Sequence, residues 1–288
     1  MAVILEQLKN ETYPIVKWVG GKRQLMFELL KNMPMSYNRY FEPFIGGGAL
    51  FFELQPQNAY ISDMNEELIN LYLTVRDNVY ELISDLNKHE VSKEYFLEIR
   101  NLDRTEKYST LSNIEKASRF IYLNRTCFNG LYRVNSNGQF NVPLGRYVNP
   151  EIVSENKILD ISNYLNVNRI DITSTDFAQA VQGAIAGDLV YFDPPYDSDT
   201  NTFNSYTEDG FDKEEQKRLA EVFKNLDKRG CYVMLSNHNT TLVNELYKDY
   251  NIHVIEAKRN INANGKKRGK VEEVIITNFE NKRGFNNE

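Results

Sequence analysis

Short apolar runs and amphipathic segments alternate near both ends of the chain. Arg39–Phe44 and Asn58–Ser62 are short runs rich in apolar and aromatic residues, which is typical of strands. Each is followed by a segment with apolar residues at three- and four-residue spacing, which predicts one helix starting near Ala49 and another over Glu66–Leu73. Strands that alternate with helices in this way indicate a parallel sheet with crossover helices.

The same alternation returns after Arg169 and continues to Asn278. The predicted strands are Ile170–Thr173, Leu189–Phe192, Cys231–Leu235, Ile252–Ala257 and Glu273–Asn278, and the predicted helices are Asp176–Val181, Lys213–Lys228 and Thr240–Tyr247. We also expect a mobile loop over 197–210, a basic loop between the last two strands and a frayed tail after Phe279. The chain is therefore predicted to be an α/β protein.

Between these two parts, over residues 75–168, the strand–helix alternation stops. Helical spacing covers Asp77–Lys88, Lys93–Asn101 and Asn113–Asn124. The segment 125–147 is dense in Asn, Gly and aromatic residues and predicts a hairpin of Phe128–Val134 against Gln139–Leu144. Asn and Arg side chains can form bidentate hydrogen bonds to base edges, and apolar side chains can wedge between bases. We therefore interpret 75–168 as an insertion that recognises a nucleic acid.

The apolar run that starts after Asp188 ends in Asp193-Pro194-Pro195-Tyr196. Two consecutive prolines cannot continue a hydrogen-bonded ladder, so the chain leaves the sheet at Asp193. In an open α/β sheet, the carboxyl ends of the strands are where ligands bind. The Asp193 carboxylate and the Pro194 carbonyl can accept two N–H bonds from a planar exocyclic amine, and Tyr196 can stack on its ring. Taken alone, the tetrapeptide is equally well explained as a strand that ends in a Pro-Pro loop.

Further segments can hold a ligand near the strand ends. Gly46, Gly47 and Gly48 form a turn between a predicted strand and a predicted helix, which lets a ligand approach the backbone closely. Asp63 directly follows the second strand, about 20 residues after the glycines, where an acid can hold two ribose hydroxyls or cap the next helix. Another glycine loop, in Lys17–Arg23, precedes a predicted helix over Gln24–Asn32, and its Trp18 fits either a core position or a stack on a flat ligand.

Composition narrows the class of protein. The 288-residue chain has ordinary apolar and charged fractions. It has no apolar run near the about 20 residues of a membrane span and no signal-peptide pattern, so we expect no membrane partner. Two cysteines, Cys127 and Cys231, and three scattered histidines indicate neither a disulfide framework nor a metal site. A cytoplasmic protein without a metal cofactor is expected.

The net charge of −6 conceals a segregation of charge. Residues 117–150 hold four arginines and no acid, and residues 257–271 hold six basic residues and no acid. These two stretches carry +10, so the remainder of the chain carries −16. Such segregation is expected when one face meets phosphates, although basic runs are also common on ordinary solvated surfaces.

The glycine turn, the acid after the second strand and Asp-Pro-Pro-Tyr follow one another in this order along the chain. The same order of motifs is typical of the α group of S-adenosylmethionine-dependent amino-methyltransferases of DNA, which this chain therefore resembles. The N-terminal KWVGGK and the segment FNGLYRVNSNGQFNVPLGRY are similar to those of the Dam-type adenine methylases, which act on GATC. The resemblance covers 15–279. It implies the methyltransferase fold, a mostly parallel seven-stranded sheet with helices on both faces, in 1–74 and 169–288. It also implies a helical and β-hairpin DNA target-recognition insertion in 75–168.

The resemblance implies that S-adenosylmethionine is the methyl donor. By matching positions, the donor would be held by Trp18, Lys22, Phe44, Gly46, Gly48, Asp63, Asp176, Phe177 and Asp193. Within this set, Asp63 would bind the ribose, the glycine turn the methionine part, and Asp176-Phe177 the adenine ring. From the residues alone, Asp176 is also explained as a helix cap.

The resemblance also implies that several residues contact double-stranded DNA. Lys17 would read the outer guanine and Arg133 the guanine near the other end of the site, although a lone lysine is also an ordinary surface charge. Phe128 stands where the family often has a Tyr that intercalates between bases. Its phenyl ring can still insert there, but it has no hydroxyl to form a hydrogen bond. The other expected DNA contacts are Arg125, Asn129, Leu131, Asn135, Asn141, Pro143 and Tyr147.

These residues fit methyl transfer to adenine N6. Hydrogen bonds to Asp193 and the Pro194 carbonyl would draw the amine nitrogen towards tetrahedral geometry, and Tyr196 would stabilise the positive charge that forms on it. Because the target atom is buried in a duplex, the base must be flipped out. Two alternatives stay open: transfer to cytosine N4, whose amine presents the same two hydrogens, and a DNA-binding regulator without activity. A pairing with a restriction endonuclease is also compatible with the sequence, and a monomer is expected.

Overall fold

The computed structural model describes residues 14–18, 20, 22, 25–198, 211–258 and 270–280. Most of the predicted loop over 197–210, most of the basic loop between the last two strands and most of the predicted tail lie outside the described residues. The chain divides into two compact units. Unit 1 comprises residues 1–21, 46–57 and 65–172, and unit 2 comprises residues 22–45, 58–64 and 173–288.

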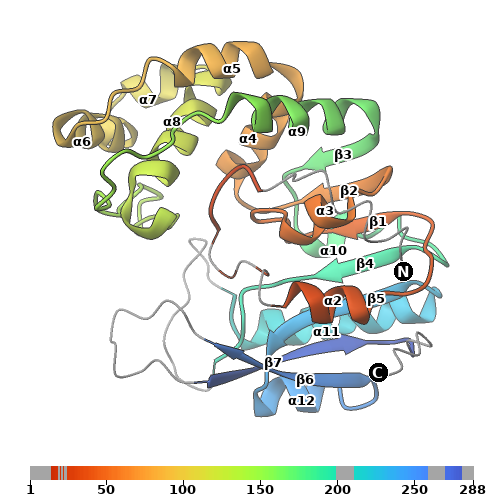
Figure 1. The fold of residues 1–288 in the computed structure, drawn as a ribbon. Coiled ribbons are helices and arrows are strands. Elements are labelled where there is room, and N and C mark those ends of the chain that lie inside the picture. The colour runs from red at the N-terminus through yellow and green to blue at the C-terminus, as the bar shows by residue number, and fades with distance from the viewer. Residues whose placement is uncertain are drawn as a thin grey trace, which may run out of the picture. The chain divides into compact units, whose positions relative to one another are not determined.

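The strands form a seven-stranded sheet in the order β3-β2-β1-β4-β5-β7-β6 (Figure 1). They are β1 (Tyr40–Glu42), β2 (Asn58–Ser62), β3 (Arg169–Thr173), β4 (Leu189–Phe192), β5 (Tyr232–His238), β6 (Asn251–Lys258) and β7 (Lys270–Thr277). The pairs β1–β2, β1–β4 and β4–β5 are parallel, whereas β7 is antiparallel to both β5 and β6. The predicted mostly parallel α/β sheet is confirmed, and β2 and β4 have the predicted bounds.

Alternation of side chains gives the sheet of unit 2 two different faces. Phe41, Val190 and Leu235 belong to one face, where they join a core with α10 (Phe177–Ala180), α11 (Lys213–Lys228) and α12 (Thr241–Leu246). The residues that alternate with them, such as Tyr191 and Ser236, belong to the opposite face. In Figure 1, α2 (Met26–Lys31) lies in front of the strands and α11 behind them. Helices therefore flank both faces of the sheet.

Unit 1 consists mainly of helices. They are α3 (Ala49–Leu54), α4 (Glu66–Asp77), α5 (Val79–Leu86), α6 (Lys93–Asn101), α7 (Lys107–Thr110), α8 (Asn113–Thr126) and α9 (Glu155–Val167), with short 3-10 turns η2 (Leu102–Arg104) and η3 (Phe128–Gly130). α8 contacts α4, α5 and α6, and α4 also contacts α9. The predicted helix over Lys93–Asn101 has its predicted bounds, whereas α9 was not predicted. None of the helices in the described residues is long and apolar enough to cross a membrane.

The predicted hairpin follows α8 and is confirmed in outline. Antiparallel bridges join Cys127 to Leu144 and Val134 to Phe140. The predicted turn is closed by the Gly138 N–H, which donates to the Asn135 carbonyl at 3.0 Å. The first arm is not a continuous strand, because the η3 turn interrupts it. The hairpin therefore presents a compact loop rather than a long two-stranded ribbon.

Candidate active site

Three strands of unit 2 end at the same edge of the sheet. Tyr40 of β1 lies opposite Ala59 of β2 and Leu189 of β4. Four residues further along each strand, the chain reaches Phe44, Asp63 and Asp193, respectively. The strand order also reverses between β1 and β4, because β2 and β3 follow on one side of β1 and β4 and β5 on the other. Because ligands bind at such reversal points in open α/β sheets, this edge is the candidate active site.

The Asp193 carboxylate is held through one of its oxygens. The Nζ of Lys22 lies 2.7 Å from Asp193 Oδ1, and the Oγ of Ser236 donates to the same oxygen at 2.7 Å. The Asp193 side chain is 20% exposed, whereas that of Lys22 is 6% exposed. Lys22 Nζ also lies 4.4 Å from the centre of the Tyr196 ring. The cationic nitrogen of Lys22 is therefore held between the Asp193 carboxylate and the Tyr196 ring. These are the two groups that the sequence predicts to bind a target amine.

Tyr196 is fixed by its own contacts. Its hydroxyl donates to Oε2 of Glu273 at 3.3 Å, and its ring meets the His238 ring edge-on at 4.8 Å. Burial raises the pKa of Tyr196 well above its ordinary value, and the negative charge of Asp193 acts in the same direction. The hydroxyl therefore stays protonated and donates to Glu273, while the edge-on contact with His238 limits rotation of the ring.

Two buried amide side chains hold the backbone on either side of Tyr196. Gln216 of α11 donates from Nε2 to the Pro195 carbonyl at 3.0 Å, and Asn237 of β5 accepts from the Asp197 N–H at 2.9 Å. Asn237 also donates to Oε1 of Gln216 at 3.1 Å. Both amides are almost fully buried. Because their bonds are shielded from water, the loop that follows Asp193 has a defined conformation.

Besides Lys22 and Asp193, two further predicted donor residues of unit 2, Phe44 and Phe177, are brought together. Their rings stack with centroids 5.3 Å apart, and the guanidinium of Arg218 lies 4.0 Å from the centre of the Phe177 ring. Asp63 is not the cap of the following helix, because α4 is capped by Asn65. The helix-cap explanation of Asp63 is therefore wrong.

Asp176 does cap a helix. Its Oδ1 accepts from the Ala178 N–H at 2.9 Å at the start of α10. Arg218 donates to both carboxylate oxygens, at 2.9 and 2.6 Å. The Arg218 guanidinium holds the pKa of Asp176 below its ordinary value. The contact between Asp176 and the donor stays a prediction, and the structure gives the carboxylate two partners within the protein.

In unit 1, Trp18 packs against the glycine turn. Gly46 and Gly48 have φ angles of 46° and 70°, in the left-handed region. A Cβ at Gly46 would lie 2.7 Å from Cδ1 of Trp18. The other neighbours of the indole are the Tyr132 ring at 5.6 Å and the Phe120 ring at 6.3 Å. Trp18 therefore joins the glycine turn to the start of the hairpin within this unit, and its contact with the donor stays a prediction.

Lys17 is tied to α8 and the hairpin. Its N–H donates to Oδ1 of Asn124 at 2.8 Å, and Asn124 Nδ2 donates back to the Lys17 carbonyl at 2.8 Å. The Lys17 ammonium donates to the Tyr147 hydroxyl at 3.3 Å. Two predicted DNA contacts, Lys17 and Tyr147, are thus neighbours, and the double hydrogen bond from Asn124 fixes the backbone of Lys17.

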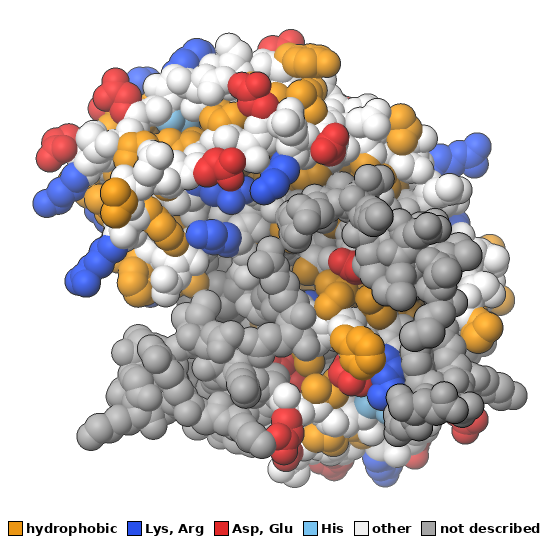
Figure 2. Space-filling view, in the orientation of Figure 1, with side chains coloured by type: hydrophobic (Ala, Val, Ile, Leu, Met, Phe, Trp, Pro, Cys, Tyr) orange, Lys and Arg blue, Asp and Glu red, His pale blue; other side chains and the backbone are white. Residues whose placement is uncertain are grey.

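The hairpin carries most of the other predicted DNA contacts. Phe128 and Tyr147 are exposed by 46% and 38%, although both are large and hydrophobic. Arg133 is exposed and donates from Nε to Oδ1 of Asn141 at 2.6 Å. Asn135 instead organises the turn, because its Oδ1 accepts from the N–H groups of Asn137 and Gln139. Of the remaining three, Asn129 and Pro143 are exposed and Leu131 is half-buried. In Figure 2, Lys and Arg side chains lie beside hydrophobic ones on this part of unit 1.

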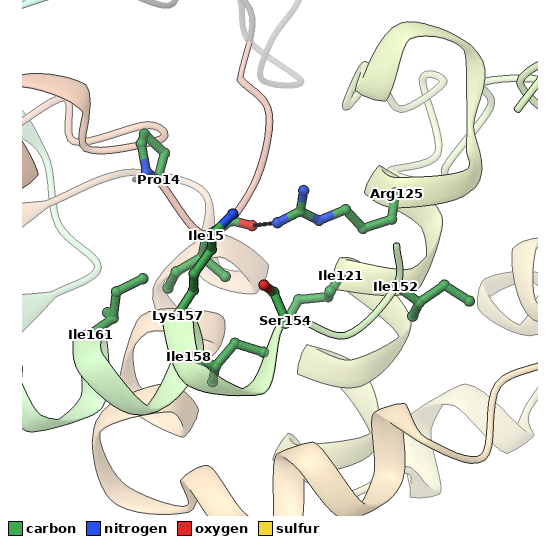
Figure 3. Close-up of a pocket in the computed structure, with 9 residues that line it drawn as sticks. All are labelled: Pro14, Ile15, Ile121, Arg125, Ile152, Ser154, Lys157, Ile158 and Ile161. Carbon is green, nitrogen blue, oxygen red and sulfur yellow. Dashed lines mark hydrogen bonds between the residues drawn. The ribbon is translucent and has the colours of Figure 1, made fainter. Parts of the chain in front are cut away.

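Arg125 points into unit 1. Its Nη2 donates to the Ile15 carbonyl at 2.7 Å, beside a small cavity lined mainly by isoleucines and including Ser154 and Lys157 (Figure 3). Its Nε is buried and has no partner in the described part of the chain. Burial lowers the pKa of Arg125. The structure gives this arginine a packing role, and the DNA contact expected from it stays a prediction.

Sequence reasoning missed the residues that support Asp193 and Tyr196. Ser236, Asn237 and Gln216 were not among the predicted site residues. A signal existed for Ser236 and Asn237, because they are polar residues that directly follow the predicted strand Cys231–Leu235. Polar side chains at the carboxyl end of a neighbouring parallel strand belong to the same edge of the sheet. Gln216 gave no such signal, since it lies within an amphipathic helix.

The strand order and the site at its reversal point define the S-adenosylmethionine-dependent methyltransferase fold. A family model of D12 class N6 adenine-specific DNA methyltransferases matches residues 18–261, and the chain belongs to this family. It is therefore an adenine-specific DNA methyltransferase, which decides against the cytosine-N4 alternative.

Relatives match over nearly the whole chain. The chain is 53% identical over 282 residues to the type II methyltransferase M1.LlaDCHI of Lactococcus lactis subsp. cremoris, covering 96% of this chain and 99% of that protein. It is 38% identical to the type II methyltransferase M.MjaIII of Methanocaldococcus jannaschii, covering 93% and 100%. It is 32% identical to the DNA adenine methylase of Escherichia coli K12, covering 93% and 95%.

Proposed function

We propose that this enzyme methylates adenine N6 within GATC in double-stranded DNA, as the methylase of a type II restriction-modification system. The observation that carries the catalytic site is the Lys22 ammonium, held 2.7 Å from the Asp193 carboxylate and 4.4 Å from the centre of the Tyr196 ring. A target amine that gains positive charge during the reaction is stabilised by the same two groups.

The chemistry follows from three groups at the end of β4. Asp193 and the Pro194 carbonyl accept the two N–H bonds of the adenine amine and draw its nitrogen towards tetrahedral geometry. This localises the lone pair that otherwise delocalises into the ring. Asp193 and the face of Tyr196 then stabilise the positive charge that develops on N6. Orientation supplies much of the acceleration, and the two buried amides that hold the loop provide it.

The residues present fit S-adenosylmethionine, which supplies a methyl group activated by its sulfonium when it is bound. The Asp63 carboxylate follows β2 and is not used as a helix cap, so an acid stands where a ribose is held in this class of fold. Phe44, which follows β1, and Phe177 at the start of α10 form a pair of stacked rings in the same unit. We propose that these residues hold the donor together with Trp18, Lys22, Gly46, Gly48, Asp176 and Asp193.

The hairpin is proposed to recognise the DNA. Its exposed Phe128 can fill the gap left by a flipped base, which compensates for part of the cost of unstacking. Arg133 has the bidentate geometry that suits guanine, and Lys17 and Tyr147 act as a pair. The choice of GATC rests on the resemblance of the hairpin sequence to Dam-type enzymes. The restriction-modification role rests on the two type II relatives, and implies a companion endonuclease.

The function is tested by incubating unmethylated DNA with the protein and S-adenosylmethionine. We expect the DNA to resist an endonuclease that cleaves unmethylated GATC, and its nucleosides to contain N6-methyladenine. Methylation without protection at GATC would contradict the target sequence and leave the reaction standing. N4-methylcytosine in place of N6-methyladenine would contradict the reaction itself.

The proposed site is tested by Asp193→Asn. The amide has one acceptor oxygen where the carboxylate has two and carries no charge, so we expect methyl transfer to fall by at least about 100-fold. The matched control is Asp171→Asn on β3, where the carboxylate is exposed. We expect the control to keep wild-type activity. A wild-type rate in Asp193→Asn would disprove the proposed role of the carboxylate.

A further inference from the structure

Ser236 stands directly beside Asp193 at the edge of the sheet. β4 and β5 are parallel, with Phe192 opposite Leu235. The next residue of each strand is therefore Asp193 in one and Ser236 in the other. Ser236 is fully buried, and its hydroxyl donates to Asp193 Oδ1 at 2.7 Å. The register of two neighbouring strands thus provides the carboxylate with a donor from the rigid part of the sheet.

The hydrogen bonds that link Tyr191, Ser236 and Asp193 are all donated towards Asp193. Ser236 has a single hydroxyl proton, and an ionised carboxylate can only accept, so this proton is directed to Asp193. The Tyr191 hydroxyl lies 2.9 Å from Ser236 Oγ and must then donate to it. Burial and the negative charge of Asp193 raise the pKa of Tyr191 well above its ordinary value, so Tyr191 keeps the proton that it donates. Tyr191, Ser236 and Asp193 therefore form a directional chain.

This chain leaves one carboxylate oxygen for a ligand. Within the described residues, Ser236 and Lys22 both reach Oδ1 of Asp193, and no hydrogen bond reaches Oδ2. Lys22 reaches Asp193 with a long, flexible side chain, whereas Ser236 donates from a strand that cannot move away. The bond from Ser236 therefore limits rotation of the carboxylate about its last torsion.

We propose that Ser236, supported by Tyr191, is a positioning residue that presents Oδ2 of Asp193 to the target amine. The inference rests on the catalytic role proposed for Asp193 and goes beyond it by naming what aims the carboxylate. Without the Ser236 donor, the carboxylate rotates and the near-attack geometry of the amine is lost more often. The donor and the DNA are held mainly by the other residues proposed for them, so their binding depends little on this rotation.

The test uses Ser236→Ala and Tyr191→Phe, each with a matched control. Ser62→Ala removes a buried hydroxyl of β2, and Tyr247→Phe removes a buried phenol hydroxyl; neither group has a hydrogen-bond partner in the described residues. Single-turnover methyl transfer to a GATC duplex is measured at saturating S-adenosylmethionine and DNA, together with both dissociation constants. We expect Ser236→Ala to slow transfer by about 10- to 100-fold and Tyr191→Phe by about 3- to 10-fold. The dissociation constants and both controls are expected to stay within about threefold of wild type.

A double variant separates positioning from general packing. If Tyr191 acts through Ser236, adding Tyr191→Phe to Ser236→Ala costs little further rate, so the two losses are not additive. Additive losses, or rates in Ser236→Ala and Tyr191→Phe no lower than in their controls, would overturn the proposal. If Ser236→Ala fails to fold, the comparison of Tyr191→Phe with its control Tyr247→Phe tests the proposal by itself.

Asp193→Asn in the same series keeps the two hypotheses apart. An inactive Asp193→Asn with wild-type rates in Ser236→Ala and Tyr191→Phe overturns the positioning role and leaves the proposed site intact. A fully active Asp193→Asn overturns the proposed site itself.

Discussion

Gly46 is the position where backbone and packing together exclude a side chain. Its φ of 46° lies in the left-handed region, and a Cβ there would meet Cδ1 and Nε1 of Trp18 at 2.7 and 2.8 Å. The indole cannot simply retreat, because it is stacked against Tyr132 and Phe120. The sequence predicted the glycine for the approach of a ligand. The structure adds a second reason, which is the approach of Trp18.

We expect Gly46→Ala to damage donor binding, and Gly138→Ala to serve as its control. Both positions have a positive φ, but a Cβ at Gly138 meets nothing within 4 Å. Backbone strain alone should cost each variant about 1–2 kcal/mol of unfolding free energy. The displaced Trp18 should weaken S-adenosylmethionine binding in Gly46→Ala by about tenfold or more, if Trp18 contacts the donor as proposed. Calorimetric titration and thermal unfolding check this. Equal donor affinity in the two variants would contradict a role for Trp18.

The helices and strands show what a single sequence predicts well. α11 was predicted with its observed bounds, because Leu219, Phe223 and Leu226 repeat along one face of a long amphipathic segment. α9 was missed, because its apolar residues are spread among Asn, Ser and Asp and its formation depends on packing against α4. Tertiary contacts of this kind override local propensity.

The candidate site likewise contains residues that the sequence predicts and residues that it does not. Asp193 and Tyr196 were predictable because two prolines mark where the strand must end. The role of Ser236 depends on which strand lies beside β4 and in what register, and a sequence does not state this. The contact between Lys22 and Asp193 was likewise unpredictable, since the two residues lie 171 positions apart in the chain.

His89 links three helices of unit 1. It follows α5, its Nδ1 lies 2.9 Å from the Tyr95 hydroxyl of α6, and its Nε2 lies 3.0 Å from Ser118 Oγ of α8. Its ring also stacks on Tyr122 at 4.4 Å. Burial lowers the pKa of His89 from 6.5 to about 4, although Asp85 acts in the opposite direction. The imidazole is therefore neutral in the folded protein at neutral pH.

This burial predicts a loss of stability in weak acid. Because the folded pKa of His89 is lowered, the unfolded chain binds the proton first as pH falls below 6.5, and stability is lost until about pH 4. We expect wild type to lose about 1–2 kcal/mol from this group between pH 7.5 and pH 5. His89→Gln, which keeps two polar contacts but cannot titrate, should lack this part of the loss. Urea unfolding of both proteins at the two pH values measures it, and an identical pH dependence would rule the assignment out.

For the chain as a whole, counting charges along the sequence overstated the positive surface of the insertion. Of the four arginines in 117–150, Arg119 is buried, with its Nη2 2.7 Å from the Asp103 carboxylate, and Arg125 donates to a backbone carbonyl. Arg133 and Arg146 are exposed. The pairing of Arg119 with Asp103 cannot be read from the charge count of 117–150, because Asp103 lies outside that acid-free stretch. The electrostatic contribution of the described hairpin to DNA binding therefore rests mainly on two arginines.

These two arginines should differ in what they contribute. Each phosphate contact made by a basic residue lowers the slope of log affinity against log salt by about 0.9. If Arg146 contacts phosphate, Arg146→Gln should flatten this slope by about one and weaken all duplexes alike. If Arg133 reads guanine, Arg133→Gln should cost about 1–3 kcal/mol on a GATC duplex and much less on a duplex with that base changed. Fluorescence anisotropy at several salt concentrations measures both, with Lys213→Gln at the exposed start of α11 as a control for loss of one positive charge. Equal weakening of both duplexes by Arg133→Gln would mean that it contributes charge alone, and the base contact would have to be sought elsewhere on the hairpin.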